Sequence, residues 1–143
     1  MTLLKPLIVA VLLLPAAGGF SPQTAFAKEI RWQSFEEGFA RGRSENKKVV
    51  VHFYARWCPA CKSMQSSTFK DPGVIAMLNR NYVPVRVDID KNKKISKMFK
   101  IKSVPDTWFI AKDYKIIGHH TGYIPPAQLK ALLKSLMKEN PAQ

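Results

Sequence analysis

The chain has 143 residues, of which 46% are hydrophobic and 23% are charged. This length suits one compact domain of ordinary size, and the composition excludes a disordered chain or a fibrous repeat. The 23 Lys and Arg residues outnumber the 10 Asp and Glu residues, so the formal net charge of +13 favours acidic partners or anionic surfaces.

The first 27 residues differ from the rest of the chain. Lys5 is their only charged residue, the apolar stretch PLIVAVLLLPAA follows it, and small residues stand at Ala25 and Ala27. This pattern predicts a secretory signal peptide cleaved after Ala27, which leaves residues 28–143 as one domain. The apolar run is shorter than the roughly 20 residues that a bilayer requires, so an uncleaved anchor is the less favoured alternative. We therefore expect a periplasmic or otherwise exported protein.

The first half of the domain is predicted to alternate helices with a strand. A short amphipathic helix is expected at 34–46, with Ser34 as its cap. The segment VVVHFYA at 49–55 is β-branched and aromatic without alternation, which is typical of a strand buried on both faces. The next helix is expected to begin at Pro59, so Cys58 would lie at a helix N-terminus.

The second half is predicted to contain a strand between two helices, then a hairpin and a closing helix. In chain order these are a helix at 71–81, a strand at 82–90, a helix at 92–101, hairpin strands at 107–111 and 115–122, and a helix at 125–140. Asp71 is expected to cap the first helix, and Ile95, Met98 and Phe99 to be the buried face of the second. Strands that are joined by helices become parallel neighbours, whereas the last two form an antiparallel hairpin. The predicted fold is α/β, with a mixed central sheet and helices on both faces.

Cys58 and Cys61 are the two cysteines of the chain. Disulfides can form in an exported protein, but a bridge that closes so small a loop removes little chain entropy, so a structural staple explains the pair poorly. A closed zinc site needs four ligands, and His119 and His120 are adjacent on a predicted strand and point to opposite faces. A redox pair is therefore favoured, and a metal site, chiefly for copper, is the weaker alternative.

The position of the pair also suggests a division of roles. The thiolate is the attacking species in thiol-disulfide exchange, and the free amides and dipole of a helix N-terminus stabilise it. We therefore expect Cys58 to be the exposed nucleophile with a lowered pKa. Cys61, one turn further along, is expected to be the shielded resolving thiol that attacks the mixed disulfide.

Three motifs in this order resemble the thioredoxin family: WCPAC after a buried strand, VDID closing the next strand, and Val104–Pro105 before a hairpin. The likeness covers residues from about 32 to 137. The segment STFKDPGV at 67–74 is similar to an extra-helix segment of exported thioredoxin-like proteins and of the C-terminal thioredoxin domain of DsbD, which cytoplasmic thioredoxin lacks. The resemblance implies a thioredoxin fold and a thiol-disulfide oxidoreductase that requires no cofactor.

The resemblance also assigns residues around the cysteines. Pro105 matches the cis-proline that faces the pair, and Val104 matches the residue whose backbone binds peptide substrates. Trp57 would shield the surface of the active site. The alternatives are an ordinary turn proline at 105 and simple packing for Trp57.

His52 departs from the family pattern. Thioredoxin and the DsbD domain have a buried aspartate at the matching position, which assists proton transfer to the resolving thiol. Histidine also exchanges protons near neutral pH and could keep this role, although Arg86, in the place of a family lysine, would favour the neutral imidazole. The alternative is a core histidine whose ring is satisfied by the backbone.

The residues between the cysteines bear on the direction of the reaction. Strong oxidants of the family carry a histidine there, whereas CPAC has none and its alanine matches the reductive, DsbD-like arrangement. We therefore expect a monomeric reductant of exported protein disulfides that receives electrons from a membrane thiol donor and has cytochrome c precursors among its substrates. The alternatives are a disulfide-forming oxidase or isomerase and a copper-binding thioredoxin-like chaperone. No nucleic-acid partner is expected, because export removes the usual targets and the lysines are scattered.

Overall fold

The computed structural model describes residues 27–138. In chain order its elements are α1 (Phe35–Ser44), β1 (Lys48–Tyr54), α2 (Pro59–Ser66), the 3-10 helix η1 (Thr68–Lys70), α3 (Pro72–Asn81), β2 (Tyr82–Asp88), α4 (Lys93–Met98), β3 (Asp106–Ile110), β4 (Ile116–Thr121) and α5 (Pro126–Lys138). The predicted signal peptide, apart from Ala27, lies outside the described residues. Within 27–138, no helix has the length and apolar character needed to cross a membrane.

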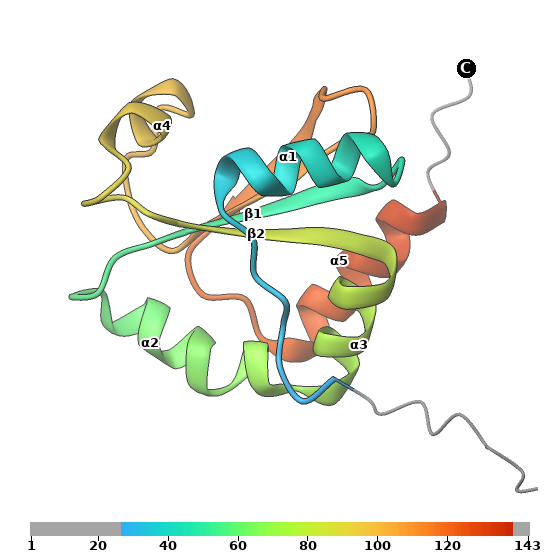
Figure 1. The fold of residues 1–143 in the computed structure, drawn as a ribbon. Coiled ribbons are helices and arrows are strands. Elements are labelled where there is room, and N and C mark those ends of the chain that lie inside the picture. Colours follow the sequence, from blue (N-terminus) through green and yellow to red (C-terminus); the bar gives the residue numbers. More distant parts are fainter. Residues whose placement is uncertain (1–26, 139–143) are drawn as a thin grey trace, which may run out of the picture.

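The strands form one mixed sheet in the order β2-β1-β3-β4. β1 pairs with β2 in parallel, whereas the β1–β3 and β3–β4 pairs are antiparallel. Helices α1 and α4 cover one face, and α2, η1, α3 and α5 cover the other (Figure 1). The predicted α/β fold, with its parallel pair, its hairpin and its two helical layers, is confirmed.

The central strand β1 is buried on both faces, as its composition predicts. Val49, Val51 and Phe53 pack in the cluster beneath α1 and α4. Val50 packs in the opposite cluster, and His52 contacts Phe69 of η1 on that same side. Side chains alternate between the faces of a strand, so β1 contributes to both cores of the domain.

Side-chain caps fix the starts of the helices that flank the sheet. Ser34 forms a capping box with Glu37 at the start of α1, and the Asp71 carboxylate accepts the Val74 N–H at the start of α3. These interactions satisfy backbone donors that a helix start leaves unpaired. Both predicted caps are confirmed, and the corresponding helices begin one residue after them.

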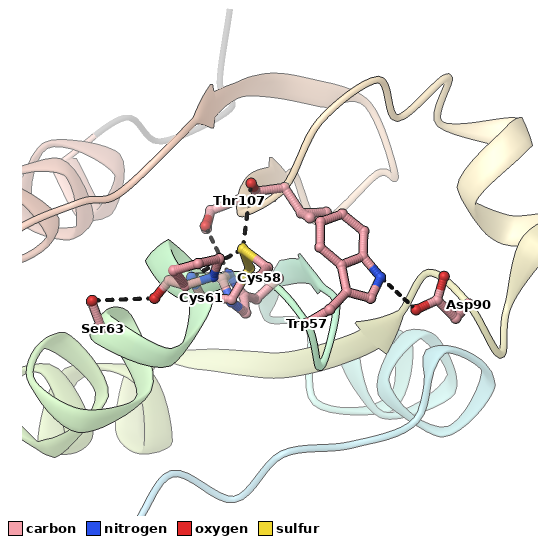
Figure 2. Close-up of a disulfide and its surroundings, with 9 residues drawn as sticks. Trp57, Cys58, Cys61, Ser63, Asp90 and Thr107 are labelled. Atoms are coloured by element: carbon pink, nitrogen blue, oxygen red, sulfur yellow. Dashed lines mark hydrogen bonds between the residues drawn. A yellow bond between two sulfur atoms is a disulfide. The ribbon is translucent and has the colours of Figure 1, made fainter.

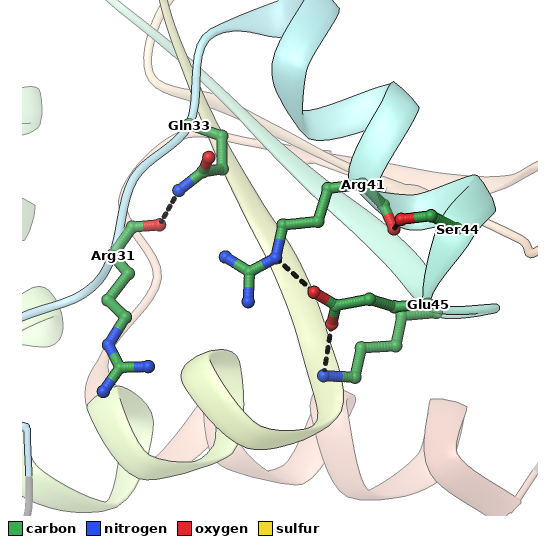
Figure 3. A network of polar contacts seen from close by, with 6 residues as sticks. Arg31, Gln33, Arg41, Ser44 and Glu45 are labelled. Carbon is green, nitrogen blue, oxygen red and sulfur yellow. Dashed lines mark hydrogen bonds and ion pairs between the residues drawn. The ribbon is translucent and has the colours of Figure 1, made fainter.

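A small ionic network closes the other end of α1 (Figure 3). Glu45 accepts from Arg41 at 2.5 Å and from Lys47 at 2.7 Å. The hydrogen bonds from Lys47 and then Arg41 lower the pKa of Glu45 to about 2, so this carboxylate is ionised at neutral pH. The network joins the end of the helix to the start of β1.

The structure departs from the predicted elements at α4, which is shorter than the helix expected at 92–101. α4 has only six residues and buries none of them fully. Ile95 and Phe99, four positions apart, pack against the sheet, but Met98 is 62% exposed, so its predicted burial is wrong. A helix this short rests on the sheet by one narrow stripe, and Met98 lies outside that stripe.

Candidate active site

Cys58 and Cys61 form a disulfide at the start of α2 (Figure 2). Cys58 is the N-cap residue and Pro59 occupies the first turn, as the sequence predicts. The Cys61 N–H donates to Cys58 Sγ at 3.1 Å. This contact satisfies a free backbone donor of the helix with the sulfur that would carry the thiolate.

Three segments that are distant in the sequence meet at the pair. Cys58 and Cys61 come from the start of α2, Ile89 follows β2, and Val104 precedes β3. The side chains of Ile89 and Val104 pack against the two cysteines, and the Val104 carbonyl oxygen lies 3.5 Å from Cys58 Sγ. The Val104–Pro105 peptide bond is cis, as the resemblance implies. The fold thus places the Val104–Pro105 segment beside the reacting sulfur.

The two cysteines do not differ in exposure. Each is only 3% exposed, so the expectation that Cys58 is the exposed thiol is wrong for the disulfide-bonded state. The sequence indicated the free helix end but could not indicate that Ile89 and Val104 pack against it. The predicted roles of the two thiols therefore rest on their positions in the helix and not on exposure.

Trp57 lies at the surface next to the disulfide. Its side chain is 64% exposed, and its indole N–H donates to Asp90 Oδ2 at 3.0 Å. Figure 2 shows the indole turned toward Asp90, which follows β2. Its apolar surface is available to a bound protein. Asp90, which holds the indole in place, was not singled out by the sequence.

His52 is buried on the central strand β1, with only 1% of its surface exposed. Its Nδ1 lies 3.1 Å from Thr107 Oγ1 on the neighbouring strand β3, and its ring meets Phe69 edge-on. Burial, and then the charge of Arg86, lower the pKa of His52 to about 3. The imidazole is therefore neutral at pH 7, and its partner is a threonine side chain instead of the predicted backbone group.

A pocket of about 440 Å³ opens beside Cys61. Tyr54, Lys62, Gln65 and Arg86 line it together with this cysteine. Gln65 Oε1 and Arg86 Nε are buried and have no hydrogen-bond partner in the described part of the chain. Buried polar atoms normally bind protein groups or ordered water, so we expect ordered water at these two atoms beside Cys61. Sequence reasoning did not identify Gln65.

His119 and His120 lie on β4, as the predicted hairpin strand implies. His119 Nδ1 is 2.9 Å from Asp106 Oδ1, and its ring stacks on Trp108 at a centroid distance of 4.3 Å. The side chain of His119 is 45% exposed. Across residues 27–138, no three His, Cys, Asp or Glu side chains are grouped so that they could hold a metal ion.

Comparison with known proteins identifies the family. A model of the thioredoxin-like domain matches residues 35–136. The chain belongs to the thioredoxin-like family. It is 40% identical over 91 residues to a thioredoxin of Mycoplasmoides gallisepticum, which covers 64% of this chain and 86% of that protein.

Two further relatives extend this result. The DsbD protein of Vibrio vulnificus is 32% identical over 71 residues, which are 50% of this chain but only 12% of DsbD. The solution structure of a thioredoxin from Thermus thermophilus superimposes with a TM-score of 0.72 at 24% identity, covering 80% of this chain and 92% of that one. The thioredoxin fold and the resemblance to thioredoxins and DsbD are both confirmed.

Family membership and the CxxC pair together define the activity. The protein is a thioredoxin-like thiol-disulfide oxidoreductase, and Cys58–Cys61 is its redox-active disulfide. Proteins of this family act on the thiols and disulfides of other proteins. The bond between the two sulfurs corresponds to the oxidised state of such an enzyme.

Proposed function

We propose that this protein is an exported reductant of protein disulfides. The observation that carries the proposal is the cysteine pair at the N-terminus of α2, facing Val104–Pro105, with no histidine between the cysteines. Cys58 is the nucleophile, Cys61 the resolving thiol, and Trp57, Val104 and Pro105 form the surface on which the substrate lies. Each role matches the position of that residue around the disulfide.

The reaction begins with both cysteines reduced. The Cys58 thiolate attacks one sulfur of the substrate disulfide, which forms a mixed disulfide and releases the other substrate sulfur as a thiolate. Cys61 then loses its proton and attacks Cys58 Sγ. This step forms the Cys58–Cys61 disulfide and releases the second substrate thiolate, so two electrons pass from the protein to the substrate.

The surroundings of Cys58 favour the reducing direction. A dithiol becomes a strong oxidant when its reduced form is stabilised, chiefly through hydrogen bonds and charges near the thiolate. Pro59 and Ala60 supply no side-chain donor. The hydrogen bonds of the described residues give Cys58 Sγ one donor, the Cys61 N–H. With one direct donor, Cys58 lacks the further hydrogen bonds that stabilise the reduced form of a strong oxidant, and this supports the reducing direction although basic residues lie near the pair.

Export and the partners belong to the same proposal. The segment at 1–27 has the charge and apolar pattern of a cleaved signal peptide. An exported reductant needs electrons from outside its own compartment, and we propose a membrane thiol protein as the donor. Exported disulfide proteins are the substrates, with cytochrome c precursors among them.

One preparation tests both direction and export. The full-length chain is expressed in a bacterium, its exported form is purified, and the protein is equilibrated with glutathione buffers of known potential. We expect the mass of the exported protein to equal that of a chain beginning at Lys28. We expect its reduction potential to be nearer to about −270 mV than to about −120 mV. A potential near the upper value would overturn the reductant, and an uncleaved protein retained in the cell would overturn export.

A trapping experiment tests the roles of the two cysteines. Cys61→Ala is expected to accumulate mixed disulfides with exported proteins, because the step that releases them needs the Cys61 thiol. Cys58→Ala is the matched control and is expected to trap none. Equal trapping by both variants on non-reducing gels, or trapping by Cys58→Ala alone, would contradict the assignment.

A further inference from the structure

A second pocket lies on the α4 side of the redox centre. Its volume is about 540 Å³, and we call it the α4 pocket. The residues that line it include Ile89, Ile101, Lys93, Lys97, Lys100 and Lys102. The two isoleucines are half-buried and the four lysines are exposed. The α4 pocket thus combines an apolar lining with strong positive charge at its surface.

The lysines of this region lack partners within the described structure. Six lysines lie between positions 91 and 102, and none of them makes a side-chain hydrogen bond or ion pair with another residue of 27–138. Elsewhere, Lys130 pairs with Asp71 at 3.1 Å. Neighbouring like charges repel one another, and a negatively charged ligand removes this repulsion. The charge of the α4 pocket therefore complements an anionic partner.

The α4 pocket shares a lining residue with the surroundings of the redox centre. Ile89 lines the pocket and also packs against the cluster that contains Cys58 and Cys61. Lys102 lines it two residues before Val104, whose carbonyl oxygen lies beside Cys58 Sγ. We therefore expect a protein whose disulfide reaches Cys58 to bring the residues next to that disulfide near the α4 pocket.

The apolar lining, the unpaired lysines and the position near the redox centre together indicate the kind of partner. We propose that the α4 pocket binds an acidic segment of the disulfide-bearing substrate. Its carboxylates pair with Lys93, Lys97 and Lys100, and an apolar side chain beside them contacts Ile89 and Ile101. A concave pocket with an apolar lining fits a polypeptide segment better than a flat lipid surface, and its position beside Cys58 couples binding to the reaction. The inference rests on the proposed reductase activity and specifies its substrate class.

Two disulfide peptides and two charge-reversal variants test this inference. The peptides share one cystine loop, and its flanking segment carries four Glu residues in one peptide and four Gln residues in the other. Each peptide is mixed with the pre-reduced protein, and the rate of its reduction is measured. This rate is divided by the rate for bis(2-hydroxyethyl) disulfide, a small neutral disulfide that corrects for differences in the basic activity of each protein. We expect the wild type to favour the Glu peptide by about tenfold, and 0.5 M salt to reduce that preference.

The double variant Lys97→Glu/Lys100→Glu is expected to lose the preference. Lys134→Glu/Lys138→Glu makes the same change in net charge on α5, across the sheet from α4, and is expected to keep it. If both variants lost the preference for the Glu peptide, a general effect of net charge would explain it, and the proposed binding at the α4 pocket would be overturned. Equal rates for the two peptides with the wild type would overturn it as well.

Two other outcomes separate this inference from its alternatives. If the reduced protein reduces neither peptide and does not reduce bis(2-hydroxyethyl) disulfide, the proposed reductase activity itself fails.

Sedimentation with phosphatidylglycerol vesicles tests whether the same lysines bind a membrane. Vesicle binding that Lys97→Glu/Lys100→Glu abolishes, together with no preference for the Glu peptide, would overturn the acidic-segment proposal in favour of a lipid surface.

Discussion

At the scale of single residues, His52 stands where the resemblance to thioredoxins implies an aspartate. The ring is buried, faces Thr107 and lies on the strand next to Arg86. The Arg86 guanidinium carbon stacks 3.9 Å from the centroid of the Tyr54 ring, so a cation already occupies this part of the core. A second positive charge there is unfavourable. The neutral imidazole follows from this arrangement, whether or not it takes part in exchange.

The lowered pKa of His52 makes the stability of the fold depend on pH. The folded protein binds this proton with a pKa of about 3, whereas the ordinary value is 6.5. The stability contributed by the neutral ring is therefore fully present above pH 6.5 and is lost as the pH falls toward 3. Between these values we expect the free energy of unfolding to fall by up to about 1.4 kcal/mol per pH unit.

Urea unfolding at several pH values between 4.5 and 7 measures this slope. His52→Gln keeps a polar group near Thr107 but does not titrate, and we expect it to lose most of the slope in this range. Comparing slopes separates the titration of His52 from any overall loss of stability in the variant. Identical slopes for the two proteins would show that His52 is protonated equally in the folded and unfolded chains.

The same variant addresses whether His52 is the base for Cys61. A base with a pKa of about 3 provides little driving force for removing a thiol proton, so we expect His52→Gln to leave the shape of the rate–pH profile unchanged. His52→Asp is the informative comparison, because it restores the residue type of thioredoxin beside Arg86. Loss of an inflection between pH 5 and 8 in His52→Gln would identify His52 as the base.

At the scale of elements, the contact between α1 and β2 depends on one glycine. Gly38 faces β2, and a Cβ atom there would overlap Val85 Cγ2. Glycine is unfavourable within a helix by about 1 kcal/mol relative to alanine. The close approach of α1 to the sheet therefore accounts for a residue that helix propensity alone would disfavour.

Gly38→Ala is expected to destabilise the fold by about 1–3 kcal/mol, because overpacking at Val85 outweighs the gain in helix propensity. The urea midpoint measures this change. Gly118→Ala on β4 is the matched control, since no atom lies within 4 Å of the added Cβ, and it should change stability by less than about 0.5 kcal/mol. Increased stability of Gly38→Ala would mean that α1 can move away from β2.

The element scale also shows where local patterns were sufficient. Ser34 and Asp71 identified the starts of α1 and α3, because a capping side chain and the backbone N–H that donates to it lie within one turn of the chain. The pattern failed at Met98, because periodicity does not specify how much of a six-residue helix the sheet can cover.

At the scale of the whole molecule, the sheet assembles the redox centre at one of its ends. The carboxyl ends of the parallel strands β1 and β2 place Cys58 beside Ile89, and the antiparallel strand β3 brings Val104 and Pro105 from the other side. Positive charge surrounds this centre, with Lys62 and Arg86 in the pocket next to Cys61 and the lysines of the α4 pocket on the other flank. The charge that seemed scattered along the sequence is thus partly concentrated beside the active site.

The sequence by itself determined the redox pair and the order of the elements. The CxxC spacing, the proline after Cys58 and the β-branched strand before it are local signals, and each acts within a few residues. Tertiary structure alone decided the burial of Cys58, the contact of Cys58 with Val104 and the pairing of His52 with Thr107. His52 and Thr107 are 55 residues apart, and Cys58 and Val104 are 46 residues apart. Burial and pKa depend on such distant neighbours, which no local pattern specifies.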